Sequence, residues 1–191
     1  MEGGAGWTKQ GTVRLWNSRT GEMLDAQIGE EGQIDFGLDF LTPGSYSVYA
    51  MSGANSIVAS LKAKGAQAVG QTIQITGGKP VELTIEMSSS LAKLNGTVRR
   101  DGKPVTGAMI LLVPDDAEIN LPKFRRDQSD SDGTYTLRDV LPGKYRVLAI
   151  DGGWDLEWGN LALLKGRLEH ARKIEVQPSK SYQTELEVEV E

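Results

Sequence analysis

Two tryptophans flanked by acidic residues form the stretch of this chain whose residue types best suit ligand binding. Trp154 and Trp158 enclose Asp155 and Glu157 in a loop with glycines at both ends. Aromatic faces beside carboxylates can stack on a sugar ring and hydrogen-bond its hydroxyls. In the alternative, both indoles cap a hydrophobic core together with Leu161, because large aromatic side chains usually contribute burial. We favour the core interpretation and keep carbohydrate binding as the alternative.

A catalytic centre would need side chains that the sequence does not provide together. A zinc hydrolase takes two histidines and a glutamate as ligands, and this chain has one histidine, His170. A G-x-S-x-G nucleophile elbow is also missing. We interpret His170 as a solvated residue at a helix end. The chain is therefore predicted to be no enzyme and to bind no metal and no cofactor.

Aspartates gather around Gly133 and raise the question of a calcium site. They are Asp127, Asp130, Asp132 and Asp139. Calcium takes oxygen ligands, but the EF-hand pattern fails because Gln128 stands at its first position and an aspartate replaces the final glutamate. We expect a hairpin that is rich in aspartate because this residue tolerates turn geometry.

Glutamates alternate with apolar residues over residues 185–191. This alternation predicts a half-buried strand with an acidic outer row. A charged face of this kind discourages edge-to-edge association of sheets. We expect no metal site there.

Composition excludes several classes of protein. The 191 residues contain no cysteine, which removes disulfides, thiolate metal sites and cysteine nucleophiles. The net charge of −5 provides no basic surface for nucleic acid. No apolar run approaches the roughly 20 residues that span a bilayer, and residues 1–6 lack the apolar core of a signal peptide. We expect either a cytosolic protein, or the mature part or a piece of a longer exported chain.

Short runs of alternating apolar and polar residues predict strands throughout the chain. These runs cover residues 12–16, 33–36, 46–50, 72–75, 81–87, 95–100, 108–113, 134–137, 145–150, 173–176 and 183–190. Asp-Gly pairs at 101–102 and 132–133 predict hairpins with primed turns. Leucines spaced by three to five residues predict one short helix within residues 160–171, packed over a sheet end. Together these features predict antiparallel β-sandwiches.

The pattern P-G-x-Y-x-V-x-A occurs twice, at residues 43–50 and 142–149, and predicts one module built twice. Proline fixes φ and glycine turns the chain into a strand. The tyrosine resembles a tyrosine corner, in which the ring enters the core and the hydroxyl bonds upstream backbone. The structural anchors predicted in this way are Pro43, Gly44, Tyr46, Pro142, Gly143 and Tyr145.

The two copies differ at their beginnings. Residues 94–100 open the second copy, whereas residues 11–14 of the first copy stand at the distance expected of a second strand. We therefore predict a first sandwich at residues 1–88 that lacks its first strand or borrows one. A second sandwich follows at residues 91–191, after a linker at residues 88–90.

The second half resembles the carboxypeptidase regulatory-like domain family. The resemblance lies in LNGTVRRDGKPVTGAMILLV and SDSDGTYTLRDVLPGKYRVLA, and it extends over residues 94–189, with a partial match at residues 28–86. It implies a prealbumin-like (transthyretin-like) sandwich without catalysis, because such domains accompany enzymes and envelope receptors. The tandem arrangement resembles large exported bacterial proteins.

Taken together, the sequence predicts an all-β chain of two tandem immunoglobulin-like antiparallel sandwiches with one short helix in the second. We expect a non-catalytic structural or interaction module of an exported bacterial multi-domain protein, at the cell envelope or outside the cell. Its expected partners are other domains of the parent chain or a surface polysaccharide, without nucleic acid or membrane insertion. Trp16 shares a strand face with Arg14 and is expected to be exposed or to lie at a domain contact.

Overall fold

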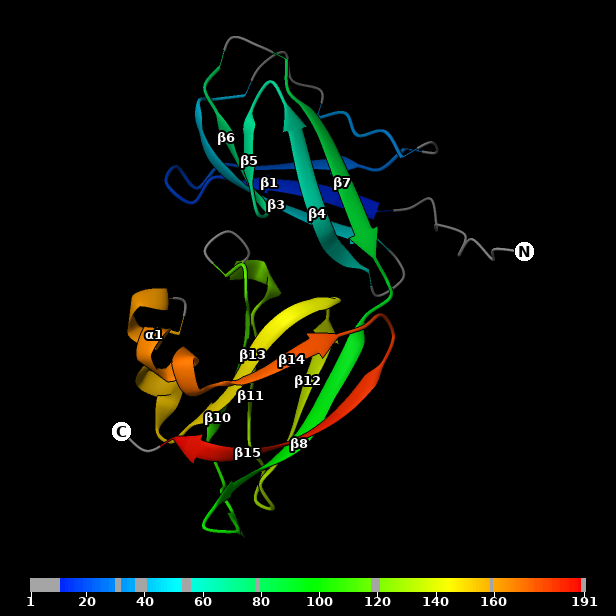
Figure 1. Cartoon of the computed structure of the whole chain (residues 1–191). Coiled ribbons are helices and arrows are strands. Elements are labelled where there is room, and N and C mark those ends of the chain that lie inside the picture. The colour runs from blue at the N-terminus through cyan, green and yellow to red at the C-terminus, as the bar shows by residue number, and fades with distance from the viewer. Residues whose placement is uncertain are drawn as a thin grey trace, which may run out of the picture. The chain divides into compact units, whose positions relative to one another are not determined.

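The chain divides into two compact units, Met1–Ser89 and Ser90–Glu191. The computed structural model describes residues 11–29, 32–36, 41–52, 56–77, 80–117, 121–158 and 160–189. Strands dominate both units (Figure 1), and the fold is an all-β sandwich architecture with one α-helix among these described residues. Within the described residues, no helix has the length and apolar character needed to cross a membrane.

The first unit stacks a five-stranded sheet on a two-stranded sheet. The larger sheet has the order β2-β1-β3-β6-β5, and the smaller one pairs β4 with β7. All of these pairings are antiparallel. The bounds are β1 Gly11–Trp16, β2 Met23–Gln27, β3 Gly44–Ser52, β4 Ile57–Lys64, β5 Gln67–Val69, β6 Thr72–Ile75 and β7 Glu82–Ser88.

The core of the first unit lies between these two sheets. Leu15, Tyr46 and Val48 of the larger sheet are fully buried against Leu61 of β4. Ile85 of β7 packs on the same cluster but stays partly exposed. The smaller sheet therefore covers this core less completely on the β7 side.

The second unit has eight strands, six of them along the path β11-β10-β13-β15-β8-β12, with β14 on β13 and β9 on β8 off that path. The bounds are β8 Ala92–Arg100, β9 Lys103–Pro104, β10 Met109–Pro114, β11 Arg125–Gln128, β12 Thr134–Val140, β13 Gly143–Ile150, β14 Arg172–Val176 and β15 Ser181–Glu189. Short 3-10 helices, η1 Leu121–Lys123 and η2 Gly153–Asp155, and the helix α1 Leu161–His170 complete it. One cluster of apolar side chains from β8, β12 and β15 packs on β10 and β13 and forms the main core.

Two of the pairings in the second unit are parallel, although the sequence predicted only antiparallel ones. β15 runs parallel to β8 over seven residue pairs, from Ser181–Lys93 to Glu187–Arg99. It also pairs in parallel with the end of β13. Glu185 and Glu187 of β15 are exposed on a strand that is paired with β8, whereas Leu186 and Val188 are buried.

Strand β10 is buried on both faces because α1 and its neighbours cover its outer side. Met109, Leu111 and Val113 point away from the main core and form a second cluster with Leu164 of α1. The helix begins where predicted, since Asn160 accepts a hydrogen bond from the Ala162 amide at 3.2 Å as its N-cap. It packs on the face of the β10–β13 pair, not over a sheet end.

Two local predictions were wrong. Residues 33–36 form no strand and contribute only the isolated bridge between Ile28 and Ile34. The Asp132-Gly133 pair makes no hairpin, because β11 pairs with β10 whereas β12 pairs with β8. Only its glycine has positive φ, 78°, so the turn is not of the primed type.

The turn at Asp101-Gly102 has positive φ at both residues, 51° and 74°. It joins β8 to β9, which pair as antiparallel neighbours. The primed hairpin predicted there is confirmed, because that turn type requires positive φ at both central positions.

Candidate functional site

The two tryptophans of the predicted ligand site have different surroundings. Trp154 lies in η2 with 41% of its surface exposed, and its indole N–H donates to the Gly107 carbonyl at 3.2 Å. Trp158 packs on the second core cluster, 5.8 Å from the Phe124 ring centre. The side chains of Asp155 and Glu157 are exposed. One indole therefore contributes to packing, and the other lies at the surface.

Arg126 of β11 brings these tryptophans into one cluster. Its guanidinium carbon lies 5.6 Å from the ring centre of Trp154 and 5.2 Å from that of Trp158. An arginine at this distance is attracted to the negative face of an aromatic ring. Arg126 therefore occupies ring surface on which a sugar would stack. Sequence reasoning missed this residue because it precedes the first tryptophan by many positions on another strand.

The aspartates around Gly133 do not form a shared metal site, and two of them accept hydrogen bonds from backbone amides. Asp127 accepts the Thr136 amide at 2.7 Å, and Asp132 accepts both the amide and the hydroxyl of Thr134. These hydrogen bonds from Thr134 hold the pKa of Asp132 below its usual value. Within the part of the chain that the structure describes, no three His, Cys, Asp or Glu side chains are placed to share a metal ion.

Arg125 fastens the start of β11 to the end of β12. Its guanidinium donates to the carbonyl of Asp139 at 2.7 and 3.0 Å, and to those of Pro122 and Phe124 at 2.8 and 2.7 Å. Burial lowers the pKa of this guanidinium. Asp139 itself has a left-handed backbone, with φ of 55°, at an irregularity of β12. The arginine thus holds a strained bend in place.

The repeated tyrosines occupy matching positions in the two units. The Tyr145 ring is buried, and its hydroxyl donates to the Leu141 carbonyl at 2.8 Å. The Tyr46 ring is buried as well, with its hydroxyl 3.0 Å from the Thr42 carbonyl and 2.7 Å from a Glu22 carboxylate oxygen. Burial raises the pKa of Tyr46, and raises that of Tyr145 to about 12. Both hydroxyls stay protonated donors at neutral pH.

The prolines and glycines of the motif precede these tyrosines. A side chain at Gly44 would place its Cβ 2.7 Å from the Asn17 amide nitrogen, and one at Gly143 would come within 3.3 Å of the Tyr145 ring. Pro43 is exposed and Pro142 is partly exposed. The glycines thus permit a close approach at the entry to β3 and β13.

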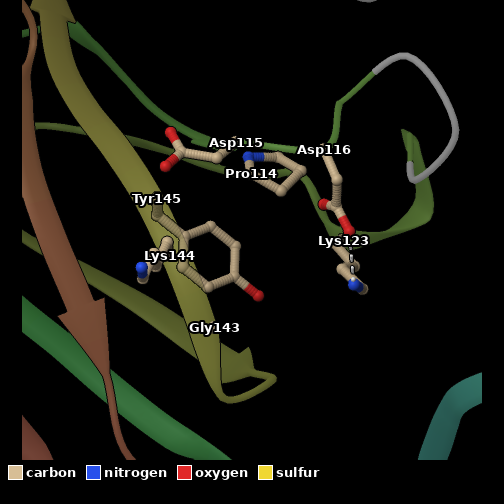
Figure 2. A pocket seen from close by; sticks show the side chains of 7 residues that line it. All are labelled: Pro114, Asp115, Asp116, Lys123, Gly143, Lys144 and Tyr145. Carbon is tan, nitrogen blue, oxygen red and sulfur yellow. Dashed lines mark hydrogen bonds and ion pairs between the residues drawn. The ribbon is translucent and has the colours of Figure 1, made fainter.

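Beside β13 lies a small hollow of about 210 Å³. Figure 2 shows its lining residues, Pro114, Asp115, Asp116, Lys123, Gly143, Lys144 and Tyr145. Lys123 pairs with Asp116 at 3.1 Å across it, and Asp115 lies 3.4 Å from Arg146. Pockets that hold small molecules usually exceed about 300 Å³. The hollow is thus smaller than a typical ligand site, and Lys123, Asp115 and Asp116 of its lining are engaged in ion pairs.

His170 is the last residue of α1 and is exposed. A basic side chain is favourable at the C-terminal end of a helix, where the backbone carbonyls point outward. The placement fits the helix-end position expected from the sequence.

An exposed apolar surface lies on the first unit, on the solvent side of β2-β1-β3. Its large apolar side chains are Trp16, Met23, Tyr49 and Met51, which are 38%, 59%, 46% and 62% exposed. Arg14 and Asp25 pair at 2.7 Å on the same side. We call this side the outer face. Trp16 was the only apolar member of it that sequence reasoning singled out, and the alternation of β1 placed it opposite Val13 and Leu15.

Comparisons with known proteins find distant structural likeness only. No family model matches the chain, and no curated protein does. Among solved structures, the minor pilin GBS52 of Streptococcus agalactiae aligns at 11% identity and a TM-score of 0.38, over 93% of this chain and 81% of the pilin. The shaft pilin SpaA of Lactobacillus rhamnosus GG aligns at 8% identity and a TM-score of 0.33, over 93% and 84%.

The TIE protein of Bacillus anthracis aligns at 16% identity and a TM-score of 0.36, over 93% of this chain and 34% of that one. This chain therefore spans about a third of that protein. All three TM-scores lie below 0.5, so the properties of these proteins are not transferred to this chain.

Proposed function

We propose that the chain is a non-catalytic structural and interaction module of an exported bacterial multi-domain protein, located in the cell envelope or outside the cell. The observation that carries the proposal is the use of its reactive side chains. Backbone groups of neighbouring segments are the hydrogen-bond partners of the Arg125, Asp127 and Tyr145 side chains. Arg126 lies against two indoles. These groups hold the fold together instead of converging on a reaction site.

We further propose that the units are two copies of one carboxypeptidase regulatory-like module. The order β2-β1-β3-β6 in the first unit parallels β11-β10-β13-β14 in the second. Tyr46 pairs with Ile73 as Tyr145 pairs with Ile174. Matching registers support a common origin, because a slip by one residue would move every side chain to the other face.

The neighbouring strand pair repeats the same register. Leu15 lies opposite Val48 in the first unit, and Leu112 lies opposite Val147 in the second. In this proposal β1 matches β10, which is the second long strand of its unit, after β8 and the two-residue β9. Among its described residues the first unit then has no counterpart of β8, the first strand, and β4 instead pairs with β7.

The outer face is the interaction surface in this proposal, and its partner is another protein domain of the parent chain. Interfaces between proteins are enriched in tryptophan, tyrosine, methionine and arginine, and depleted in lysine. The outer face presents Trp16, Tyr49, Met23 and Arg14 on three adjacent strands. Exposed methionines favour a protein over a polysaccharide, because flexible thioethers adapt to an apolar partner surface.

Site-specific photo-crosslinking in cells that express the parent protein tests this surface. Benzoylphenylalanine in place of Met51 should yield adducts with a peptide from another domain of the parent chain. The matched control is the same substitution at Leu163 of α1, an exposed apolar residue of the second unit. Equal adducts at both positions, or none at Met51, would contradict the proposed surface.

Assays of turnover and metal dependence test the absence of catalysis. The purified chain should not turn over ester, peptide or glycoside substrates, and a chelator should leave its thermal midpoint unchanged. Turnover that co-purifies with the chain and disappears on substitution of one polar side chain would overturn the proposal. A chelator-induced fall in the midpoint would do the same for the absence of a bound metal.

Carbohydrate binding at Trp154 and Trp158 is the second candidate function. Trp154 favours it, since this indole is exposed beside the exposed Asp155 and Glu157. Glycan-array binding that disappears with Trp154→Ala and returns with Trp154→Phe would support this reading. Binding that is unaffected by Trp154→Ala, or no binding at all, would remove it.

A further inference from the structure

The first and last strands of the second unit lie side by side and run in the same direction. β8 opens this unit and β15 closes it, drawn in green and red in Figure 1. Their register extends from Lys93–Ser181 to Arg99–Glu187. Tension on the N-terminal end of β8 and the C-terminal end of β15 pulls the two strands in opposite directions along their axes. The backbone hydrogen bonds between them are then loaded together, in shear.

We propose that the second unit is a mechanical clamp that resists tension transmitted along the polypeptide. The inference rests on the proposed structural role and specifies that this role is resistance to tension. A single backbone hydrogen bond contributes only about 1 kcal/mol to equilibrium stability. Resistance to force depends instead on the barrier to unfolding. Bonds in shear must break nearly together, so they raise that barrier more than bonds that break in sequence.

Side chains and close packing reinforce the β8–β15 pair. Arg99 donates to a Glu185 carboxylate oxygen at 2.8 Å, and the Asn95 amide group donates to the Ser181 hydroxyl at 3.3 Å. A Cβ on Gly96 would stand 1.9 Å from the Thr184 carbonyl oxygen, so only glycine permits this approach of the strands. These contacts bridge the two strands along most of their shared length.

Both strands are also held from their other sides. β12 pairs with β8 in antiparallel orientation from Thr134–Thr97 onward. The end of β15 pairs with the end of β13. β8 is thus embedded between β12 and β15, and β15 is anchored to β13 at its C-terminal end.

The first unit lacks this arrangement among its described residues. β1 belongs to the five-stranded sheet, whereas β7 belongs to the two-stranded sheet, and no backbone pairing joins them. Tension between β1 and β7 therefore loads the apolar layer between the sheets instead of a row of hydrogen bonds. We expect this unit to yield at lower force.

Optical tweezers can load one folded protein in two directions. The chain has no cysteine, so introduced cysteines serve as unique handle sites, and Ser89 and Lys180 are exposed. Ser89→Cys with a handle at the C-terminus loads β8 and β15 in shear. Ser89→Cys with Lys180→Cys pulls the N-terminal ends of both strands apart and breaks their bonds one after another.

The expected rupture force of the second unit is at least about twofold higher in the shear direction. Comparable equilibrium stability of the two cysteine variants, checked by thermal unfolding, excludes stability as the cause of the difference. Equal rupture forces in the two directions would overturn the clamp. That result would leave the structural role standing, because the turnover and crosslinking experiments test that role separately.

Pulling the full chain by its ends compares the two units directly. At about 3.5 Å per residue, unfolding of Gly11–Ser88 releases roughly 270 Å and unfolding of Ala92–Glu189 roughly 340 Å of contour length. The shorter step should come first, at the lower force. The reverse order would contradict the clamp.

Arg99→Ala should lower the rupture force of the longer step. The pair that it breaks is exposed, so equilibrium stability should change by less than about 1 kcal/mol. Arg14→Ala is the matched control, because it breaks the exposed cross-strand pair with Asp25 in the first unit. An equal fall in the longer step with Arg14→Ala would show a nonspecific effect and count against the clamp.

Discussion

In the first unit the sheet β2-β1-β3-β6-β5 leaves large apolar side chains exposed on its outer face, whereas in the second unit the sheet around β10 and β13 is covered on both sides. Met51 of β3 is 62% exposed, and Ile150 near the end of β13 is 1% exposed. The cover in the second unit is the connection between β13 and β14, which carries η2 and α1. In the first unit the chain between β3 and β6 forms β4 and β5 instead. The connection after the motif strand thus decides whether its sheet keeps a free surface.

The largest expected effect is a loss of stability confined to the second unit. Gly96→Ala places a methyl group 1.9 Å from the Thr184 carbonyl and 2.7 Å from the Tyr135 ring. We expect it to cost about 3 kcal/mol of unfolding free energy by forcing β8 and β15 apart. Chemical denaturation should show an earlier transition for this unit and an unchanged one for the first.

Gly166→Ala in α1 is the matched control for that substitution. A Cβ there meets nothing within 4 Å. In a helix interior the change should stabilise by up to about 1 kcal/mol. A tolerated alanine at position 96 would contradict the close approach of β8 and β15.

A smaller loss of stability distinguishes the sheet face covered by α1 in the second unit from the outer face of the first unit. Leu164→Ala removes the fully buried side chain by which α1 packs on the sheet and should destabilise the second unit by about 2 kcal/mol. Met51→Ala on the outer face should change stability by less than about 0.5 kcal/mol. Both values follow from denaturation midpoints. Similar costs for the two substitutions would mean that the outer face is covered as well.

The smallest effect concerns acid stability of the turn at Asp132. Hydrogen bonds from Thr134 lower the pKa of this carboxylate below its ordinary value of 3.8. Its stabilising contribution is therefore complete above the unfolded pKa, and it is lost as pH falls through the lower folded pKa. Asp132→Asn should make the second unit less sensitive to acid below about pH 4, as measured by unfolding at several pH values. An unchanged acid profile would contradict a role for this carboxylate in the turn.

Local pattern was enough to predict most strands and the helix. Alternation located β1, β6 and β13, and leucine spacing located α1. Strand β4 escaped prediction because the spacing of Val58 and Leu61 does not alternate, in keeping with the register irregularity there. β11 escaped because four polar residues, 125–128, form it. A strand of this kind exists through its pairing with β10, which no local pattern encodes.

The surroundings of the candidate ligand residues could not be predicted from the sequence, because they depend on how the strands pair. The sequence showed Trp154 and Trp158, and the partial burial of Trp158 agrees with the usual role of aromatic side chains in packing. The position of Arg126 against both rings depends on the pairing of Arg126 with Leu111 in the β11–β10 ladder. The parallel contact of β8 with β15 likewise joins residues about ninety positions apart in the chain. One feature of the fold did leave a signal in the sequence. The continuous apolar run at residues 108–113 indicates that β10 is buried on both faces, because burial of both faces removes the alternation of apolar and polar residues.

Methionine oxidation tests most directly whether the first unit exposes one face of its larger sheet while the second unit covers the corresponding face. Under dilute hydrogen peroxide, mass spectrometry should show fast oxidation of Met23 and Met51, which are 59% and 62% exposed. Met109, fully buried on β10 beneath α1, should stay reduced until the second unit unfolds. Equal oxidation rates of Met51 and Met109 in the folded protein would contradict the account.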